Sequence, residues 1–228
     1  IKNPFFRVEI GQVFDVVPEL QNIVQVMRVG REYLILPRAE RDRLYRNNGD
    51  GSFIDVTDQC GMKDYDFGLS ATWWDHNEDG WPDLYVANDF FGADRLYQNT
   101  GDGTFTDVIN STIPHTPWFS MGTDIGDLNN DGRIDLMASD MAGTSHYRQK
   151  VSMGDMEQNR WFLLGAEPRQ YMRNTLYLNT RTNRFMEVAN LLGLANSDWT
   201  WSAKLNDMDN DGWVDVYLTN GMQRDYFN

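Results

Sequence analysis

Three short acidic segments contain the residues best suited to bind a ligand. They read D-H-N-E-D-G-W-P-D at 75–83, D-L-N-N-D-G-R-I-D at 127–135 and D-M-D-N-D-G-W-V-D at 207–215, so all three fit the pattern D-x-[DN]-x-D-G-x-x-D. Positions 1, 3, 5 and 9 offer side-chain oxygens, position 7 offers a backbone carbonyl, and the glycine at position 6 permits the sharp turn that brings them together. Such hard oxygen ligands suit Ca²⁺.

The spacing therefore predicts three calcium sites. Their expected ligands are Asp75, Asn77, Asp79, Trp81 and Asp83; Asp127, Asn129, Asp131, Arg133 and Asp135; and Asp207, Asp209, Asp211, Trp213 and Asp215, with Trp81, Arg133 and Trp213 acting through their carbonyl groups. Mg²⁺ would demand tighter octahedral geometry, and Zn²⁺ would require His or Cys, of which the chain has three and one. An EF-hand would place Glu at position 12, which is Val86, Ala138 and Leu218 here.

A plain polar turn is the alternative interpretation for any one of these loops, because Asp, Asn and Gly are common turn residues. Three copies in one phase argue against it. Without a cation, each loop would also crowd three or four carboxylates together, at about 1 kcal/mol or more for each close pair.

A repeated unit positions the loops. Leu-Tyr pairs occur at 44–45, 96–97 and 176–177, each Tyr is followed eight residues later by Phe, and Asp75, Asp127 and Asp207 lie thirty residues after the three tyrosines. Strands expected before and after each loop, followed by the Leu-Tyr hairpin, give four strands per unit. Units of four strands every ~50 residues are typical of the blades of a β-propeller.

The third unit is longer because residues 142–173 are inserted between Asp127 and Tyr177. Residues 1–42 are less regular, although 23–29 and 32–36 are expected to be strands that join the first hairpin in a blade without a metal loop. We therefore expect an all-β, partial propeller of about three and a half units in all, with the regular repeat region over residues 43–228 and one inserted segment that stays outside its own sheet.

Composition narrows the class of function. The formal charge of −14 argues against nucleic acid as a partner. Cys60 is the only cysteine, so no internal disulfide can stabilise the chain and metal ions are the natural substitute.

No stretch is apolar for long enough to span a membrane, and residues 1–7 lack the pattern of a signal peptide, so a mature or trimmed sequence is expected.

The motifs around the loops are similar to those of FG-GAP/VCBS-repeat proteins, whose repeats also form the propeller of integrin α-subunits. The resemblance covers about 43–228 and is carried by T-W-W-D at 72–75, D-L-Y-V-A-N-D at 83–89 and R-L-Y-Q-N at 95–99. Segments 119–122, 169–174 and 219–221 resemble bacterial secreted members that carry a C-terminal ASPIC/UnbV domain. The resemblance implies calcium in the loops between the first two strands of a blade, and adhesion or surface recognition outside the cytoplasm.

We therefore expect a calcium-binding protein of the cell surface, periplasm or extracellular space, with structural Ca²⁺ and a protein, glycan or assembly partner, rather than an enzyme. The alternative is an enzyme acting on acidic polysaccharides, with His146, Tyr147, Arg148 and Lys150 of the insertion as base and charge neutralisers. The simpler interpretation is that these four residues belong to a solvent-exposed segment or form a partner contact. The tryptophans at 73, 74, 199 and 201 and the tyrosines at 45, 97 and 177 are expected to pack between blades rather than stack on sugars.

Overall fold

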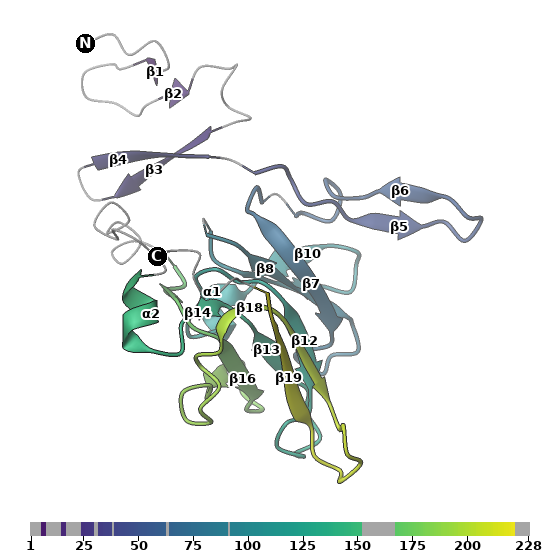
Figure 1. Ribbon diagram of the computed structural model, residues 1–228. Helices are drawn as coiled ribbons and strands as arrows, with labels where there is room; N and C mark the ends of the chain where they lie inside the picture. The colour runs from purple at the N-terminus through teal and green to yellow at the C-terminus, as the bar shows by residue number, and fades with distance from the viewer. Residues whose placement is uncertain are drawn as a thin grey trace.

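The structure is a computed structural model that describes residues 6–7, 15–16, 24–29, 32–37, 39–62, 64–90, 92–151 and 167–221. Within these residues the regular secondary structure is almost entirely β-strand, as the sequence predicts, and the sheets are nearly all antiparallel (Figure 1). No helix in the described ranges is long and apolar enough to cross a membrane.

The first complete blade contains four strands in sequence order. They are β7 (Gly68–Trp74), β8 (Asp83–Asn88), β9 (Arg95–Asn99) and β10 (Phe105–Asp107), each antiparallel to the next. The β9–β10 turn contains Gly101 and Gly103 with φ of 80° and 88°, a conformation that glycine adopts without a steric penalty. This turn supports the hairpin that the sequence predicts.

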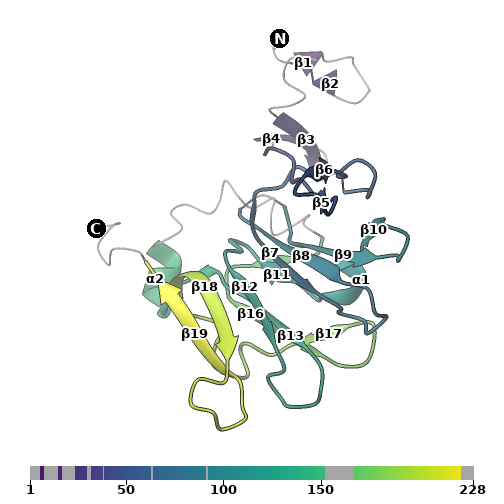
Figure 2. The same ribbon diagram turned by 90° about the vertical axis from the view of Figure 1, so that its right-hand side faces the viewer.

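The second blade has the same four-stranded order despite the insertion. It contains β12 (Thr123–Gly126), β13 (Asp135–Ala138), β16 (Thr175–Asn179) and β17 (Phe185–Glu187). A third, three-stranded sheet contains β14 (Met141–Ala142), β18 (Asp198–Asn206) and β19 (Asp215–Asn220). Figure 2 shows the three sheets side by side as an open series.

The hairpin register repeats as the sequence spacing predicts. Tyr97 lies opposite Asp107, Tyr177 lies opposite Glu187, and in the first hairpin Tyr45 lies opposite Asp55. Because the register of a hairpin decides which side chains face the core, this agreement places the same positions of each unit on the same face.

The first unit does not form the single blade that the sequence predicts. Its strands are β3 (Val24–Val29), β4 (Glu32–Pro37), β5 (Tyr45–Asn47) and β6 (Phe53–Asp55), and they make two separate two-stranded sheets, as do β1 (Phe6–Arg7) and β2 (Asp15–Val16). The segment that connects β4 to β5 makes hydrogen bonds to residues that follow β6. Ala39 N donates to Tyr65 O (3.3 Å), and Arg41 Nη1 donates to Asp58 Oδ1 (2.5 Å).

The insertion leaves its own sheet, but its two ends pair with neighbouring elements. Ala142 lies in β14, which pairs with β18 of the next sheet. At the other end, β15 (Gln170–Tyr171) runs parallel to β11 (Thr116–Pro117). The helix α2 (His146–Val151) lies between these two ends in the chain. Residues 152–166, including Trp161, lie outside the described residues.

Adjacent blades pack through their innermost strands. The Thr123 hydroxyl of β12 lies 2.9 Å from the Ser70 hydroxyl and 2.6 Å from the Thr72 hydroxyl of β7. On the other side of β12, Asp124 Oδ2 accepts a hydrogen bond of 2.9 Å from Leu205 N of β18. A buried cluster between the first two blades includes Trp74, Tyr85, Leu96, Ile109, Leu136 and Tyr177, and the short helix α1 (Ile109–Thr112) contributes to it.

Candidate metal sites in three acidic loops

Each acidic loop joins two adjacent antiparallel strands, which are the first two strands of the blade in the first two sheets and β18 and β19 in the third. Residues 75–83 connect β7 to β8, residues 127–135 connect β12 to β13, and residues 207–215 connect β18 to β19. Position 1 therefore directly follows one strand, and the aspartate at position 9 opens the next. Both ends of every loop are held by an antiparallel pair, which is the placement that the sequence predicts.

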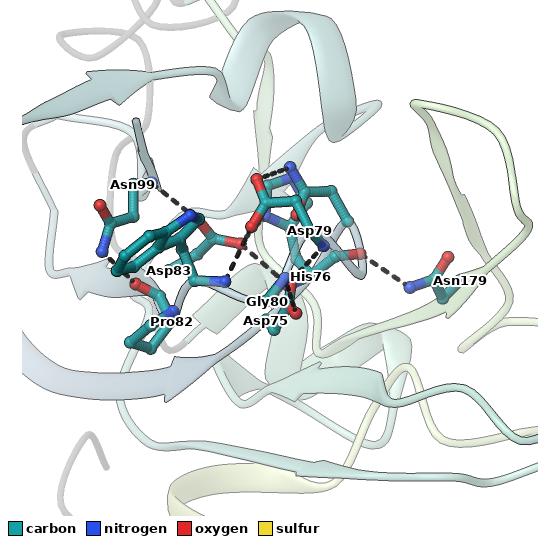
Figure 3. Close-up of polar contacts among 10 residues, drawn as sticks. Asp75, His76, Asp79, Gly80, Pro82, Asp83, Asn99 and Asn179 are labelled. Carbon is teal, nitrogen blue, oxygen red and sulfur yellow. Dashed lines mark hydrogen bonds and ion pairs between the residues drawn. The ribbon is translucent and has the colours of Figure 1, made fainter. Parts of the chain in front are cut away.

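The first loop folds around its own carboxylates (Figure 3). Asp75 Oδ1 accepts from Asp79 N (3.1 Å) and Asp75 Oδ2 accepts from Gly80 N (2.7 Å). Asn77 Oδ1 accepts from Asp79 N (3.2 Å), and Asp79 Oδ1 accepts from Trp81 N (2.9 Å). These bonds turn the side chains at positions 1, 3 and 5 toward the inside of the loop.

The other two loops repeat this pattern bond for bond. The corresponding acceptors are Asp127, Asn129 and Asp131 in the second loop and Asp207, Asp209 and Asp211 in the third, at distances of 2.8–3.2 Å. Position 4 is left-handed in all three loops, with φ of 62° at Glu78, 55° at Asn130 and 61° at Asn210. The three loops thus share one backbone conformation at position 4, although their side chains differ.

The aspartates at position 9 are held within their loops, and two of them are also held by the third strand of the blade. Oδ2 of Asp83, Asp135 and Asp215 accepts the backbone N–H of position 2 at 2.9–3.0 Å. Oδ1 of Asp83 and of Asp135 also accepts, at 2.8 Å, the backbone N–H of Asn99 and of Asn179 on the third strand of the blade. The loop motif does not include these two asparagines, although an Asn two residues after each Leu-Tyr pair is a detectable signal in the sequence.

The third loop fits a cation most directly. Carboxylate oxygens of Asp207, Asp209 and Asp215 lie within 4.8 Å of one another, and Asp211 is outside this group. In the first two loops position 3 is Asn77 or Asn129, whose amide nitrogen donates to the aspartate at position 5. The available groups are carboxylate, amide and carbonyl oxygens, which suit Ca²⁺.

The loops carry unbalanced negative charge. The pKa of Asp135 is raised, first because the carboxyl group is buried and then because Asp131 and Asp127 place negative charge nearby. In the first loop His76 Nδ1 contacts Asp83 Oδ2 at 2.5 Å, so Asp83 has an additional partner that the other two loops lack.

The three loops lie along one side of the blades and contact one another. Arg133 Nε of the second loop lies 3.3 Å from Glu78 Oε1 of the first. Asn130 Nδ2 of the second loop donates to Gly212 O of the third at 2.8 Å. The loops therefore form one continuous surface.

At the ends of the strands away from the acidic loops, two buried carboxyl groups hold separate segments of the chain together. Asp140 Oδ2 accepts the backbone N–H of Trp118, Phe119 and Arg173. Asp94 accepts from the Tyr85 hydroxyl (2.5 Å), the Ser120 hydroxyl (2.8 Å) and Asn88 N (2.9 Å). Burial raises the pKa of each carboxyl group to about 7. Segments 119–122 and 169–174, singled out in the sequence, thus contribute Ser120 and Arg173 to these junctions.

The other candidate residues have mixed placements. Trp74, Tyr97 and Tyr177 are buried, whereas Trp73 is 44% exposed, Trp201 47% and Tyr45 52%, so the expected packing between blades is incomplete for these three. The four insertion residues of the enzyme hypothesis lie on α2, where His146, Tyr147 and Lys150 are exposed and Arg148 pairs with Asp198.

Comparison with known proteins agrees with this architecture. The model of the FG-GAP-like repeat matches residues 30–86 and 75–138. Cartilage acidic protein 1 of Xenopus tropicalis is 28% identical over 188 residues, which is 78% of this chain and 25% of that relative. The chain thus spans about a quarter of that relative's length. The chain therefore carries two FG-GAP-like repeats, and a third unit follows them in the same phase.

Proposed function

We propose that this protein binds three Ca²⁺ ions in its acidic loops and acts as a calcium-stabilised binding module outside the cytoplasm. The observation that carries the proposal is the identical hydrogen-bond pattern of the three loops, together with the oxygen cluster of Asp207, Asp209 and Asp215. When bound, the ion would neutralise carboxylates whose repulsion otherwise opposes folding.

The metal role is structural in this proposal. Asp83 and Asp135 accept backbone N–H groups of the third strand, so a bound ion would tie the first two loops to their own blades. Adhesion or surface assembly then depends on the exposed faces of the blades. No residue of the chain is assigned a catalytic role.

An extracellular location fits the chemistry of such loops. Extracellular calcium modules work with dissociation constants of about 10⁻⁴–10⁻³ M, which exposed loops of this kind can meet without a closed cage. The similar protein from Xenopus tropicalis is named for cartilage and for acidity, and this chain is also acidic, with a formal charge of −14.

Elemental analysis of protein purified with calcium and passed through a desalting column tests the proposal. We expect three calcium ions per chain and a rise in the thermal midpoint when calcium is added to metal-free protein. One ion or none per chain would overturn the proposal, and equal stabilisation by Mg²⁺ would show that the loops do not select the larger ion.

A further inference from the structure

A polar cavity lies between the first two blades, on the side of the acidic loops. Its volume is about 520 Å³, within the range of small-ligand sites. One wall is formed by residues 76–78 of the first loop, another by Arg133 of the second loop, and a third by residues 179 and 181–183 at the β16–β17 turn. Three segments far apart in the sequence therefore meet around one space.

Arg133 is the buried cation of this cavity, whereas Arg181, which also lines it, is exposed. The Arg133 side chain is only 6% exposed, yet its Nε lies 3.3 Å from Glu78 Oε1 and its two terminal amino groups make no hydrogen bond with any residue that the structure describes. The guanidinium lines the cavity, so a ligand in the cavity can supply partners for these amino groups. Its free fork matches the two oxygens of a carboxylate or sulfate group.

The rest of the cavity offers neutral hydrogen-bonding groups beside this fork. Gln98 and Asn183 supply amides, and Ser111 and Thr182 supply hydroxyls. Amides and hydroxyls both donate and accept, as the hydroxyl groups of a sugar do. His76 and Phe185 stack at 6.3 Å between ring centroids and close the apolar side of the cavity.

We propose that this cavity binds an acidic sugar, with the carboxylate or sulfate group of the sugar on the terminal amino groups of Arg133. The inference rests on the proposed binding function, for which it names a site and a class of ligand. Glu78, whose side chain is 61% exposed, competes with the ligand for the guanidinium. Calcium in the two flanking loops would add positive charge beside the cavity and favour an anion.

Isothermal titration calorimetry in one calcium buffer tests the proposal with two matched pairs of probes. Trigalacturonate is compared with its methyl ester, and N-acetylglucosamine 6-sulfate with N-acetylglucosamine. We expect at least one acidic probe to bind and its neutral counterpart to bind at least about tenfold more weakly. The acidic probe that binds identifies the source of the anion.

Variants connect that binding to the cavity. Arg133→Gln should weaken binding of the acidic probe at least about tenfold, as should Arg133→Lys, which keeps the charge but loses the fork. Glu78→Gln should strengthen binding about two- to fivefold, because the competing carboxylate is removed. None of these three substitutions changes a side-chain ligand of the loops. Because the carbonyl of Arg133 is an expected ligand, calcium content is measured for each variant beside sugar binding.

The proposal is overturned if neither acidic probe binds, if the neutral counterparts bind equally, or if the Arg133 variants bind as the wild type does. If Arg133→Gln does not fold, Arg133→Lys decides. Absence of calcium from the wild-type protein would instead overturn the proposed function. A calcium-loaded protein that ignores both acidic sugars removes only the present inference.

Discussion

Asn130 Nδ2 in the second acidic loop donates a hydrogen bond of 2.8 Å to the carbonyl oxygen of Gly212 in the third. Asn130 has a left-handed φ of 55°, which glycine also adopts, so Asn130→Gly removes the bond without backbone strain. We expect calcium affinity at the third loop to fall about two- to tenfold, the effect of one hydrogen bond. Calorimetric titration measures this.

Asn210→Gly is the matched control for that experiment. Asn210 holds the same position in the third loop, with φ of 61°, and its side chain has no hydrogen bond to another described residue. An unchanged third-site affinity in Asn130→Gly, or an equal loss in Asn210→Gly, would contradict coupling between the loops.

The third loop should bind calcium most tightly. It has Asp209 where the other loops have Asn77 and Asn129, and more ligand charge raises calcium affinity. Asp209→Asn should therefore lower the affinity of that site about tenfold and bring it to the level of the first two. Titration of the variant followed by elemental analysis checks the result, and an unaltered tightest site would refute the ranking.

The buried carboxyl group of Asp94 should make stability depend on pH. Its pKa is raised by burial to about 7, so between about pH 4 and 7 the folded chain binds a proton that the unfolded chain releases. The free energy of unfolding should fall as pH rises through this window, by about 1.4 kcal/mol per pH unit for this group, and level off above it. Urea unfolding from pH 4.5 to 7.5 measures this slope.

Asp94→Asn should flatten that dependence without breaking the junction. The equivalent position of the next unit is Asn174, whose Oδ1 accepts Asp140 N at 2.7 Å, as Asp94 Oδ1 accepts Asn88 N. Asp140, with a similarly raised pKa, supplies the remaining slope in the variant. An identical pH profile for wild type and variant would show that Asp94 does not titrate in this range.

The middle of the insertion should be dispensable for folding. Replacing residues 145–166 with a short Gly/Ser linker removes α2 but keeps β14, β15 and the bond from Arg173 N to Asp140. We expect the thermal midpoint to change by only a few degrees. Removing all of 142–173 should cost several degrees more, since it also deletes both strand pairs. Loss of cooperative unfolding in the shorter deletion would assign α2 to the core.

The outer face of the third sheet should promote association. Tyr217 is 57% exposed, whereas Tyr85 and Met137, at the same position of the first two blades, are fully buried. An uncovered apolar sheet face favours self-association. Tyr217→Ser should therefore lower the associated fraction seen by chromatography with light scattering. Tyr147→Ser, at a tyrosine that is 67% exposed on α2, should leave the associated fraction unchanged. Equal effects of the two substitutions would show that this face does not drive association.

The sequence alone determined the repeat and the loops. The spacing of thirty residues from Tyr97 to Asp127 reflects a constant number of strand and turn residues, and the structure places each loop between two adjacent antiparallel strands. Local rules suffice here because Gly80 and its counterparts select the turn and strand alternation selects the face. The hairpin register at Tyr45, Tyr97 and Tyr177 follows from the same local constraints.

Only the tertiary structure decided what lies between the units. Arg133 was named for its backbone carbonyl, whereas its side chain lines a cavity beside Glu78, 55 residues away. The carboxyl groups of Asp94 and Asp140 are buried because separate segments converge on them, and no local pattern reveals this. Contacts between blades depend on how sheets pack and on where an insertion pairs, which are long-range properties that residue spacing does not contain.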